Sequence, residues 1–451
     1  MEKVVVVGGG IAGLVASILL TKSANQVYLI EREESCGGLL RSFQNEDGVN
    51  FDYGTHVLSE TRIDELDAVL FEDMDERGWE TFDILKPGNF FQGKLYDRNQ
   101  LIYAPYLPEA VYYKGLTEIL HTEPFEKPVE NLSVYTEKQY GKTFSNYIYR
   151  PLMKKLLGCD LEELHQDAHL LFGYARLIVA NAHTSRELKK SPFFDGKLSF
   201  ESFYEGISPM KKYYPKDRGG IGKWVKQLEE KAQQLGVNIL TSRSVSSVQR
   251  NGNKISSVTL DNNLVLECDH LVWTLAPFTL LQAAQIKIDS QPPKFRNMTL
   301  HHFVFNKPFL VRNFFVYCND VNYESFRITL YPNITKTEIT TAPFNCTVEV
   351  LSDKVEDLSQ LNEKIYRELI DLGIVDESAE VIYQKAQNID RGFPVYTNQF
   401  VEQNQFQKEL IAQKMENISL LGKGNGVSFF MHEVLVEAFH ECNKIGQLET
   451  V

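Results

Sequence analysis

The stretch Val4-Val-Val-Val-Gly-Gly-Gly-Ile-Ala-Gly13 decides the fold, because it joins an apolar strand to the start of a helix through a glycine turn. Four consecutive valines are typical of a central parallel strand that is covered on both faces. Beyond the glycines, apolar residues recur at helical spacing, at Ile11, Leu14, Val15, Ile18 and Leu19. The sequence therefore predicts a strand, a tight turn and a helix in direct succession.

The glycines of this turn, Gly8, Gly10 and Gly13, follow the spacing G-x-G-x-x-G. In this pattern the first glycine allows a sharp turn, the second lets the backbone approach a pyrophosphate, and the third lets the helix pack closely on the strand. The free N–H groups and the positive dipole end of the helix then face the phosphate. The sequence therefore predicts a binding site for the phosphates of a nucleotide.

A second strand is expected at Gln26–Ile30, and it ends directly before Glu31. An acidic residue roughly 20 residues after the glycine turn binds the ribose hydroxyls in dinucleotide-binding folds. Glu31 therefore favours an adenosine with a free 2′-hydroxyl over one with a 2′-phosphate.

Length and composition narrow the class of protein. A chain of 451 residues is long enough for two domains. The net charge of −13 argues against nucleic acid and anionic membranes as partners. No apolar run reaches membrane-spanning length and no basic leader precedes the first strand, which predicts a cytoplasmic location. The six scattered cysteines suggest neither disulfides nor a zinc site, and no metal site is expected.

A resemblance emerges downstream of Glu31, where Arg32, the pair Gly37-Gly38 and Phe51-Asp52-Tyr-Gly-Thr-His56 follow in order. This series resembles the opening of FAD-dependent enzymes of the protoporphyrinogen oxidase and amine oxidase superfamily, and also that of UDP-galactopyranose mutases. The resemblance implies FAD as the cofactor. It implies an α/β protein with a Rossmann-like FAD-binding domain (GR2-type) and an α+β substrate domain built on an antiparallel sheet.

The later segments continue the resemblance. A helix is expected at 224–235 and a strand at 237–240, and Val245 stands where superfamily members contact adenine through the backbone. Near the C-terminus, a strand ending at Gly422 and a helix over 433–442 are expected beside the flavin. The glycine pattern and the resemblance together give these cofactor-binding residues: Gly8, Gly10, Ala12, Gly13, Glu31, Arg32, Gly37, Gly38, Leu39, Leu40, Gly54, Thr55, His56, Val245, Gly422, Val427 and Met431.

The domain organisation follows from where the alternation of strands and helices breaks. The FAD domain is expected to be discontinuous, at 1–60, 205–285 and 386–451. The substrate domain is expected at 61–204 and 286–385, with the pocket at the junction of the two.

Within the expected substrate domain, the patterns predict helices at 63–71, 161–180 and 358–372 and short strands within 90–105. Alternating strands at 298–305, 324–331 and 345–351 predict a half-buried antiparallel sheet beneath the pocket.

Two kinds of chemistry remain open at this point. The first is an FAD-dependent oxidoreductase that acts at the flavin N5 on a small anionic substrate, with His56, Arg327 and Lys423 as candidate catalytic residues. The alternative is a non-redox sugar-nucleotide mutase that resembles UDP-galactopyranose mutase. Against the mutase, Ser59 replaces a second histidine and Lys423 an arginine; against amine oxidation, the position near Leu300 carries no lysine.

Less specific interpretations stand beside these. Arg327 could form a structural ion pair, and His56 could simply pack against the cofactor. A third reading is an FAD-stabilised scaffold without catalysis. The expected partner is a small-molecule substrate, and a homodimer is left open. No integral membrane segment is expected.

Overall fold

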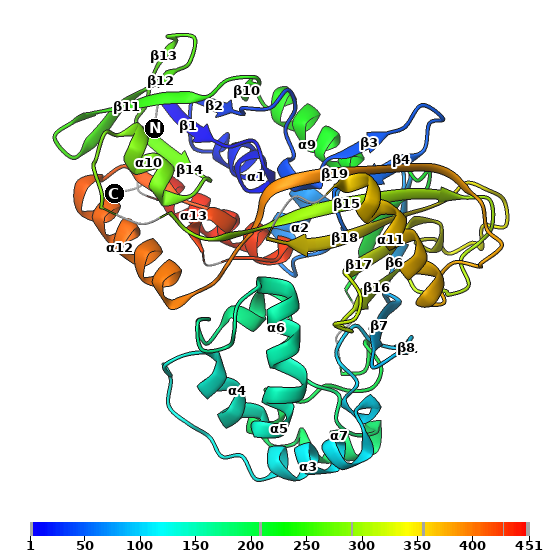
Figure 1. Cartoon of the computed structure of the whole chain (residues 1–451). Coiled ribbons are helices and arrows are strands. Elements are labelled where there is room, and N and C mark those ends of the chain that lie inside the picture. The colour runs from blue at the N-terminus through cyan, green and yellow to red at the C-terminus, as the bar shows by residue number, and fades with distance from the viewer. Residues whose placement is uncertain (1–2, 207–209, 290–291, 354–356, 427, 448–451) are drawn as a thin grey trace.

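The computed structural model describes residues 3–206, 210–289, 292–353, 357–426 and 428–447 (Figure 1). At its centre lies a five-stranded sheet in the order β10-β2-β1-β14-β20, in which every neighbouring pair is parallel. Its strands are β1 (Lys3–Val7), β2 (Gln26–Ile30), β10 (Asn238–Leu240), β14 (His270–Trp273) and β20 (Ile418–Leu420). Segments far apart in the chain thus build one nucleotide-binding sheet.

The run of four valines in β1 is buried on both sides of this sheet, as predicted. Val4 and Val6 join a core with the helices on one face, while Val5 and Val7 join a core with a small antiparallel sheet on the other. The helices on the first face are α1 (Ile11–Leu20), α9 (Gly222–Gln234) and α13 (Met431–Gln447). The second face carries β11 (Val245–Asn251), β12 (Lys254–Leu260), β13 (Val265–Glu267), α10 (Pro277–Ala283) and α12 (Asn398–Lys414).

A second, seven-stranded sheet has the order β19-β15-β18-β17-β16-β7-β8. Its neighbouring strands are antiparallel except for the β16 and β7 pair, which is parallel. The strands are β7 (Pro87–Phe91), β8 (Lys94–Tyr96), β15 (Phe295–Phe305), β16 (Phe315–Cys318), β17 (Ser325–Leu330), β18 (Phe344–Ser352) and β19 (Val381–Pro394). Helix α11 (Leu358–Asp371) packs on one face through Leu361, Ile365 and Leu369. The other face is directed toward the Gly54 turn and the helical lobe.

A helical lobe lies below the two sheets in Figure 1 and packs against the seven-stranded sheet through Met298, Leu300 and Leu351. Its helices are α3 (Glu109–Leu120), α4 (Leu132–Tyr140), α5 (Lys142–Phe144), α6 (Arg150–Leu157), α7 (Ala182–Leu188) and α8 (Pro192–Asp195). Short elements connect the parts, namely β3 (Ser42–Gln44), β4 (Asn50–Asp52), β5 (Leu58–Ser59), α2 (Asp64–Leu70), β6 (Trp79–Phe82) and β9 (Lys212–Pro215).

The helix predicted over 161–180 is wrong, because only a single short 3₁₀ turn at Ala168–Phe172 forms there. Neighbouring segments instead use the backbone of this stretch: Leu132 donates to the Leu164 carbonyl, and His165 donates to the Tyr396 carbonyl, each at 2.9 Å. The apolar side chains are buried, but the backbone hydrogen bonds are divided between local turns, such as Ala168 N to the His165 carbonyl, and other parts of the chain.

The predicted domain boundaries can be compared with these sheets. The boundary at 385 and 386 falls inside β19, which pairs with β15 along its length. Strand β6 was assigned to the substrate domain, yet it pairs with β9 from the returning FAD segment. The division into two domains stays a prediction. Within the described residues, no helix combines the length and apolarity that crossing a bilayer requires.

Candidate functional site

The first glycine turn has the shape expected of a phosphate-binding site. Gly8 has φ +100°, and a Cβ there would lie 2.2 Å from Thr274 Oγ1. A Cβ on Gly13 would lie 1.9 Å from the Gly8 carbonyl oxygen, so this position requires close packing of helix on turn. A Cβ on Gly10 would meet no atom within 4 Å. The space beside Gly10 is therefore open, as backbone approach to a pyrophosphate requires.

The second glycine turn lies directly against the first. Gly37 has φ +114° and donates from its N–H to the Gly9 carbonyl at 2.7 Å. Gly38 follows with φ +57° and begins the 3₁₀ turn that contains Leu39 and Leu40. The two predicted glycine turns are thus joined into one backbone surface next to the helix N-terminus.

Glu31 occupies the end of β2, as predicted, and its carboxylate accepts hydrogen bonds from Gly9 N at 2.6 Å and Glu33 N at 2.8 Å. Its backbone carbonyl accepts from Arg243 N at 3.0 Å, which brings the chain leading to Val245 beside it. Arg32, also predicted to bind the cofactor, is exposed and pairs with Glu33 at 3.1 Å. Its part in cofactor binding stays a prediction.

The C-terminal segment reaches the same turns. Gly422 has φ +79°, and a Cβ there would lie 3.1 Å from that of Ala12. The Gly422 N–H donates to Glu437 of α13 at 3.0 Å, and Met431 begins that helix. Val427, the remaining predicted cofactor residue of this segment, lies outside the described residues.

Arg327 owes its orientation to a β-bulge in β17. Ser325 pairs with Val350 and Arg327 with Glu349. Between these two pairs, β17 therefore contains one more residue than β18. The extra residue is Phe326. Because strand side chains alternate between faces, this shift turns Arg327 away from the α11 face, where Ser325 points, and toward the opposite face.

Arg327 is held on that face by Glu349, which is fully buried. Its Nε and Nη2 donate to the two carboxylate oxygens of Glu349, each at 2.7 Å, and Nη1 donates to the Tyr317 hydroxyl at 3.3 Å. Glu349 also accepts from Thr55 N at 3.0 Å. The ion pair therefore connects the sheet to the Gly54 turn, where Gly54 has φ +113° and a Cβ would lie 3.3 Å from the same carboxylate.

His56 and Lys423 complete the charged cluster. Burial, with smaller contributions from the nearby charges of Arg327 and Lys423, lowers the pKa of His56 to about 3, so the imidazole is neutral. Its Nε2 is buried and has no hydrogen-bond partner within the described part of the chain. Burial also lowers the pKa of Lys423, with a further contribution from Arg327 that Glu349 opposes. The three predicted catalytic residues thus lie within electrostatic reach of one another.

Lys423 combines an exposed surface with a pKa lowered by burial. These two properties fit a side chain in a recess of the protein, since an ammonium on a convex surface would keep its hydration. No hydrogen bond from its Nζ to another described residue is present. A cation so placed can bind an anionic group.

Sequence reasoning missed Glu349 and Tyr317, the two partners of Arg327. Glu349 stands inside the apolar run Thr347-Val-Glu-Val350 of a buried strand. A lone carboxylate in such a run needs a cationic partner, and this signal could have identified Glu349. Tyr317 had no comparable signal.

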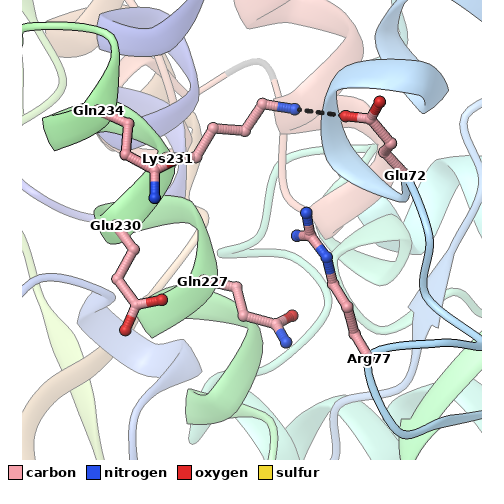
Figure 2. A pocket seen from close by; sticks show the side chains of 6 residues that line it. All are labelled: Glu72, Arg77, Gln227, Glu230, Lys231 and Gln234. Carbon is pink, nitrogen blue, oxygen red and sulfur yellow. Dashed lines mark hydrogen bonds and ion pairs between the residues drawn. The ribbon is translucent and has the colours of Figure 1, made fainter.

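Another hollow lies away from this cluster. It is lined by Glu72, Arg77, Gln227, Glu230, Lys231 and Gln234, on α9 and the loop after α2 (Figure 2). None of the predicted site residues contributes to it. Across the described ranges, no group of histidines, cysteines and carboxylates could hold a metal ion.

The two glycine turns, the open space at Gly10 and the unpartnered His56 Nε2 beside them fit a flavin dinucleotide, and the fold is that of a nucleotide-binding flavoprotein. The chain belongs to the flavin containing amine oxidoreductase family, whose profile matches residues 11–308. Its cofactor is FAD.

Curated relatives are distant. The chain is 24% identical over 430 residues to a 4,4′-diapolycopene oxygenase from Methylomonas sp, with 85% of this chain and 84% of that protein aligned. It is 23% identical over 302 residues to a phytoene dehydrogenase from Streptomyces griseus, with 61% of this chain and 54% of that protein aligned. The chain thus spans most of the first relative but about half of the second.

Solved structures confirm the fold over the whole chain. Reduced UDP-galactopyranose mutase has a TM-score of 0.79 at 16% identity, covering 99% of this chain and 96% of that one. A putative protoporphyrinogen oxidase from Exiguobacterium sp. 255-15 has a TM-score of 0.69 at 14% identity, covering 99% of each. At these identities the likeness concerns the fold.

Proposed function

We propose that this flavoprotein oxidises a small anionic substrate at the flavin N5. The observation that carries the proposal is the cluster of Arg327, Lys423 and neutral His56 on the face directed toward the Gly54 turn. When bound, FAD supplies the acceptor for the hydride. The protein supplies binding, orientation and electrostatics.

Each residue of the cluster has a distinct role in this proposal. Lys423 donates no hydrogen bond to another described residue, and it binds the anionic group of the substrate as a point charge. Arg327 is held in place by Glu349 and Tyr317, so its positive charge stays on the face directed toward the Gly54 turn. His56 stays uncharged at neutral pH and offers a hydrogen bond to the cofactor or the substrate without adding to the repulsion between the two cations.

A second candidate is a non-redox sugar-nucleotide mutase. The same pair of cations that favours a carboxylate also favours the diphosphate of a nucleotide sugar. Lysine in place of an arginine at position 423 weakens this candidate, because an ammonium cannot bind two phosphate oxygens as a planar fork does.

The names of the curated relatives suggest a third substrate, a carotenoid-like polyene. The charged cluster argues against a polyene bound at this position, because a hydrocarbon chain would desolvate Lys423 and offer it no partner. A polyene becomes the better choice if removal of the Lys423 charge leaves substrate oxidation unchanged.

The test uses the FAD-loaded protein under anaerobic conditions, mixed in turn with carboxylate-bearing amines, sugar nucleotides and a detergent-dispersed carotenoid. We expect an anionic compound to bleach the oxidised flavin, and Lys423→Met to weaken its binding by roughly tenfold or more. Turnover of a sugar nucleotide by the reduced protein, with no net flavin oxidation, would support the mutase. Bleaching by the polyene alone, equal in Lys423→Met, would overturn the proposal.

A cytoplasmic location and a homodimer, both considered from the sequence, stay predictions. Gel filtration of the FAD-loaded chain tests the second.

A further inference from the structure

The loop between β16 and β17, together with the strand ends Cys318 and Ser325, is held from two sides by side chains of distant elements. From the helical lobe, Lys155 of α6 donates from Nζ to the carbonyl oxygens of Cys318, Asp320 and Ser325, each at 2.8 Å. One ammonium thus satisfies three carbonyls that converge on a single point.

The second set of hydrogen bonds to this loop comes from α11 on the other face of the sheet. The buried carboxylate of Glu368 accepts from Glu324 N and Ser325 N, each at 2.9 Å, and from Ser325 Oγ at 2.6 Å. The peptide groups on both sides of Ser325 are therefore fixed, its N–H by one side chain and its C=O by another.

Ser325 immediately precedes the bulge at Phe326 that turns Arg327 toward the site. Without that extra residue, Arg327 would share the face of Ser325 and point toward α11. The direction of Arg327 therefore depends on the conformation of a backbone that Lys155 and Glu368 hold.

We propose that Lys155 is a positioning residue, which fixes the bulge that aims Arg327 and so couples the helical lobe to the charged site. Glu368 acts with it from the opposite face. The inference rests on the proposed function only in treating Arg327 as a group that attracts the substrate anion. Neither residue is within the cluster itself.

The experiment compares Lys155→Met with Lys154→Met in the FAD-loaded protein. Lys154 is the neighbour on α6, and it is exposed and paired with Asp160 at 3.2 Å. The first readout is the 15Nε resonance of Arg327, identified by its loss in Arg327→Lys. We expect Lys155→Met to shift or broaden this resonance and Lys154→Met to leave it in place.

The second readout is binding of inorganic pyrophosphate, followed by the flavin difference spectrum. We expect roughly tenfold weaker binding in Lys155→Met and no further loss when Lys155→Met is added to Arg327→Lys. If the parent protein binds no pyrophosphate, the anionic substrate is wrong, while the Arg327 resonance still decides the positioning role.

Should Lys155→Met fail to retain FAD, Glu368→Gln tests the same coupling, with the exposed Glu363→Gln on α11 as its control. It should displace the Arg327 resonance in the same way. An Arg327 resonance that is unchanged in a folded Lys155→Met or Glu368→Gln protein would overturn the inference.

Discussion

Arg327 and Glu349 form a two-pronged ion pair across neighbouring strands, with Nε–Oε1 and Nη2–Oε2 distances of 2.7 Å. The Glu349 side chain is 1% exposed and that of Arg327 is 19% exposed. Such pairs add little net stability over apolar residues of similar volume, but removing one partner leaves an uncompensated charge inside the protein. The pair therefore makes each of its members costly to change alone.

Glu349→Met should lower the free energy of unfolding by about 3 kcal/mol, at the low end of the range for buried pairs because Arg327 is partly exposed. The double variant Arg327→Met with Glu349→Met should recover most of this loss. Urea denaturation of the FAD-free proteins measures both. A double variant less stable than Glu349→Met would show that the two residues do not act as a pair.

Lys423→Met should affect stability and binding in opposite directions. Its ammonium has a pKa lowered by burial and by Arg327, so removing the charge relieves desolvation and repulsion. We expect an unchanged or higher melting temperature, together with weaker pyrophosphate binding. Lys414→Met, at the end of α12, is the control and should alter neither property. A lower melting temperature with unchanged binding would contradict a ligand-binding role.

Gly10→Ala should reduce FAD retention without harming the fold. Gly10 has φ −64° and ψ 177°, which alanine adopts easily, and the new methyl group would enter open space. That space is where the pyrophosphate is expected, so the affinity for FAD should fall by roughly tenfold or more. Titration of the FAD-free protein with FAD measures it, with Gly196→Ala as the control. Undiminished FAD affinity would mean that the phosphate site is assigned wrongly.

Gly13→Ala should destabilise the fold itself, because its Cβ would lie 1.9 Å from the Gly8 carbonyl oxygen. Helix α1 must then move away from the turn, at a cost of about 1–3 kcal/mol. Urea denaturation of the FAD-free protein, compared with Gly10→Ala, separates this packing role from ligand contact. Equal stability of the two variants would contradict the assignment.

The sequence was sufficient where local pattern and tertiary environment agree. The valines of β1 are apolar on both faces because both faces are covered, and the turn after them allows few residues other than glycine at Gly8 and Gly13. Strand β2 and the position of Glu31 follow from the same regularity.

The sequence was insufficient where long-range pairing decides. The stretch 161–180 has helical spacing of apolar residues. However, its Leu164 carbonyl accepts a hydrogen bond from Leu132 N, and its His165 N donates to the Tyr396 carbonyl. In β17, regular alternation alone would turn Arg327 toward the face of Ser325, and only pairing with β18 reveals the bulge. Glu349 was missed because its partner is defined by that register.

The last prediction concerns His169, which is fully buried in the helical lobe beside Tyr135, with ring centroids 4.9 Å apart. Burial, with a smaller contribution from the charge of Lys127, lowers the pKa of His169 to about 3. In the unfolded chain a histidine titrates near pH 6.5. The unfolded state therefore binds more protons between these two values, and the stability that depends on neutral His169 is complete above pH 6.5 and lost as the pH falls toward 3.

His169→Phe removes this proton linkage and keeps an aromatic ring against Tyr135. Between pH 7.5 and pH 5, the parent should lose about 2 kcal/mol more unfolding free energy than the variant, at about 1.4 kcal/mol per pH unit below 6.5. Urea denaturation at a series of pH values measures the difference, and contributions common to both proteins, such as those of buried His270 and His302, cancel. The exposed His183→Phe is the control and should follow the parent. Parallel curves for parent and His169→Phe would mean that His169 has the same pKa in the folded and the unfolded protein, because stability is independent of pH only where both states bind equal numbers of protons.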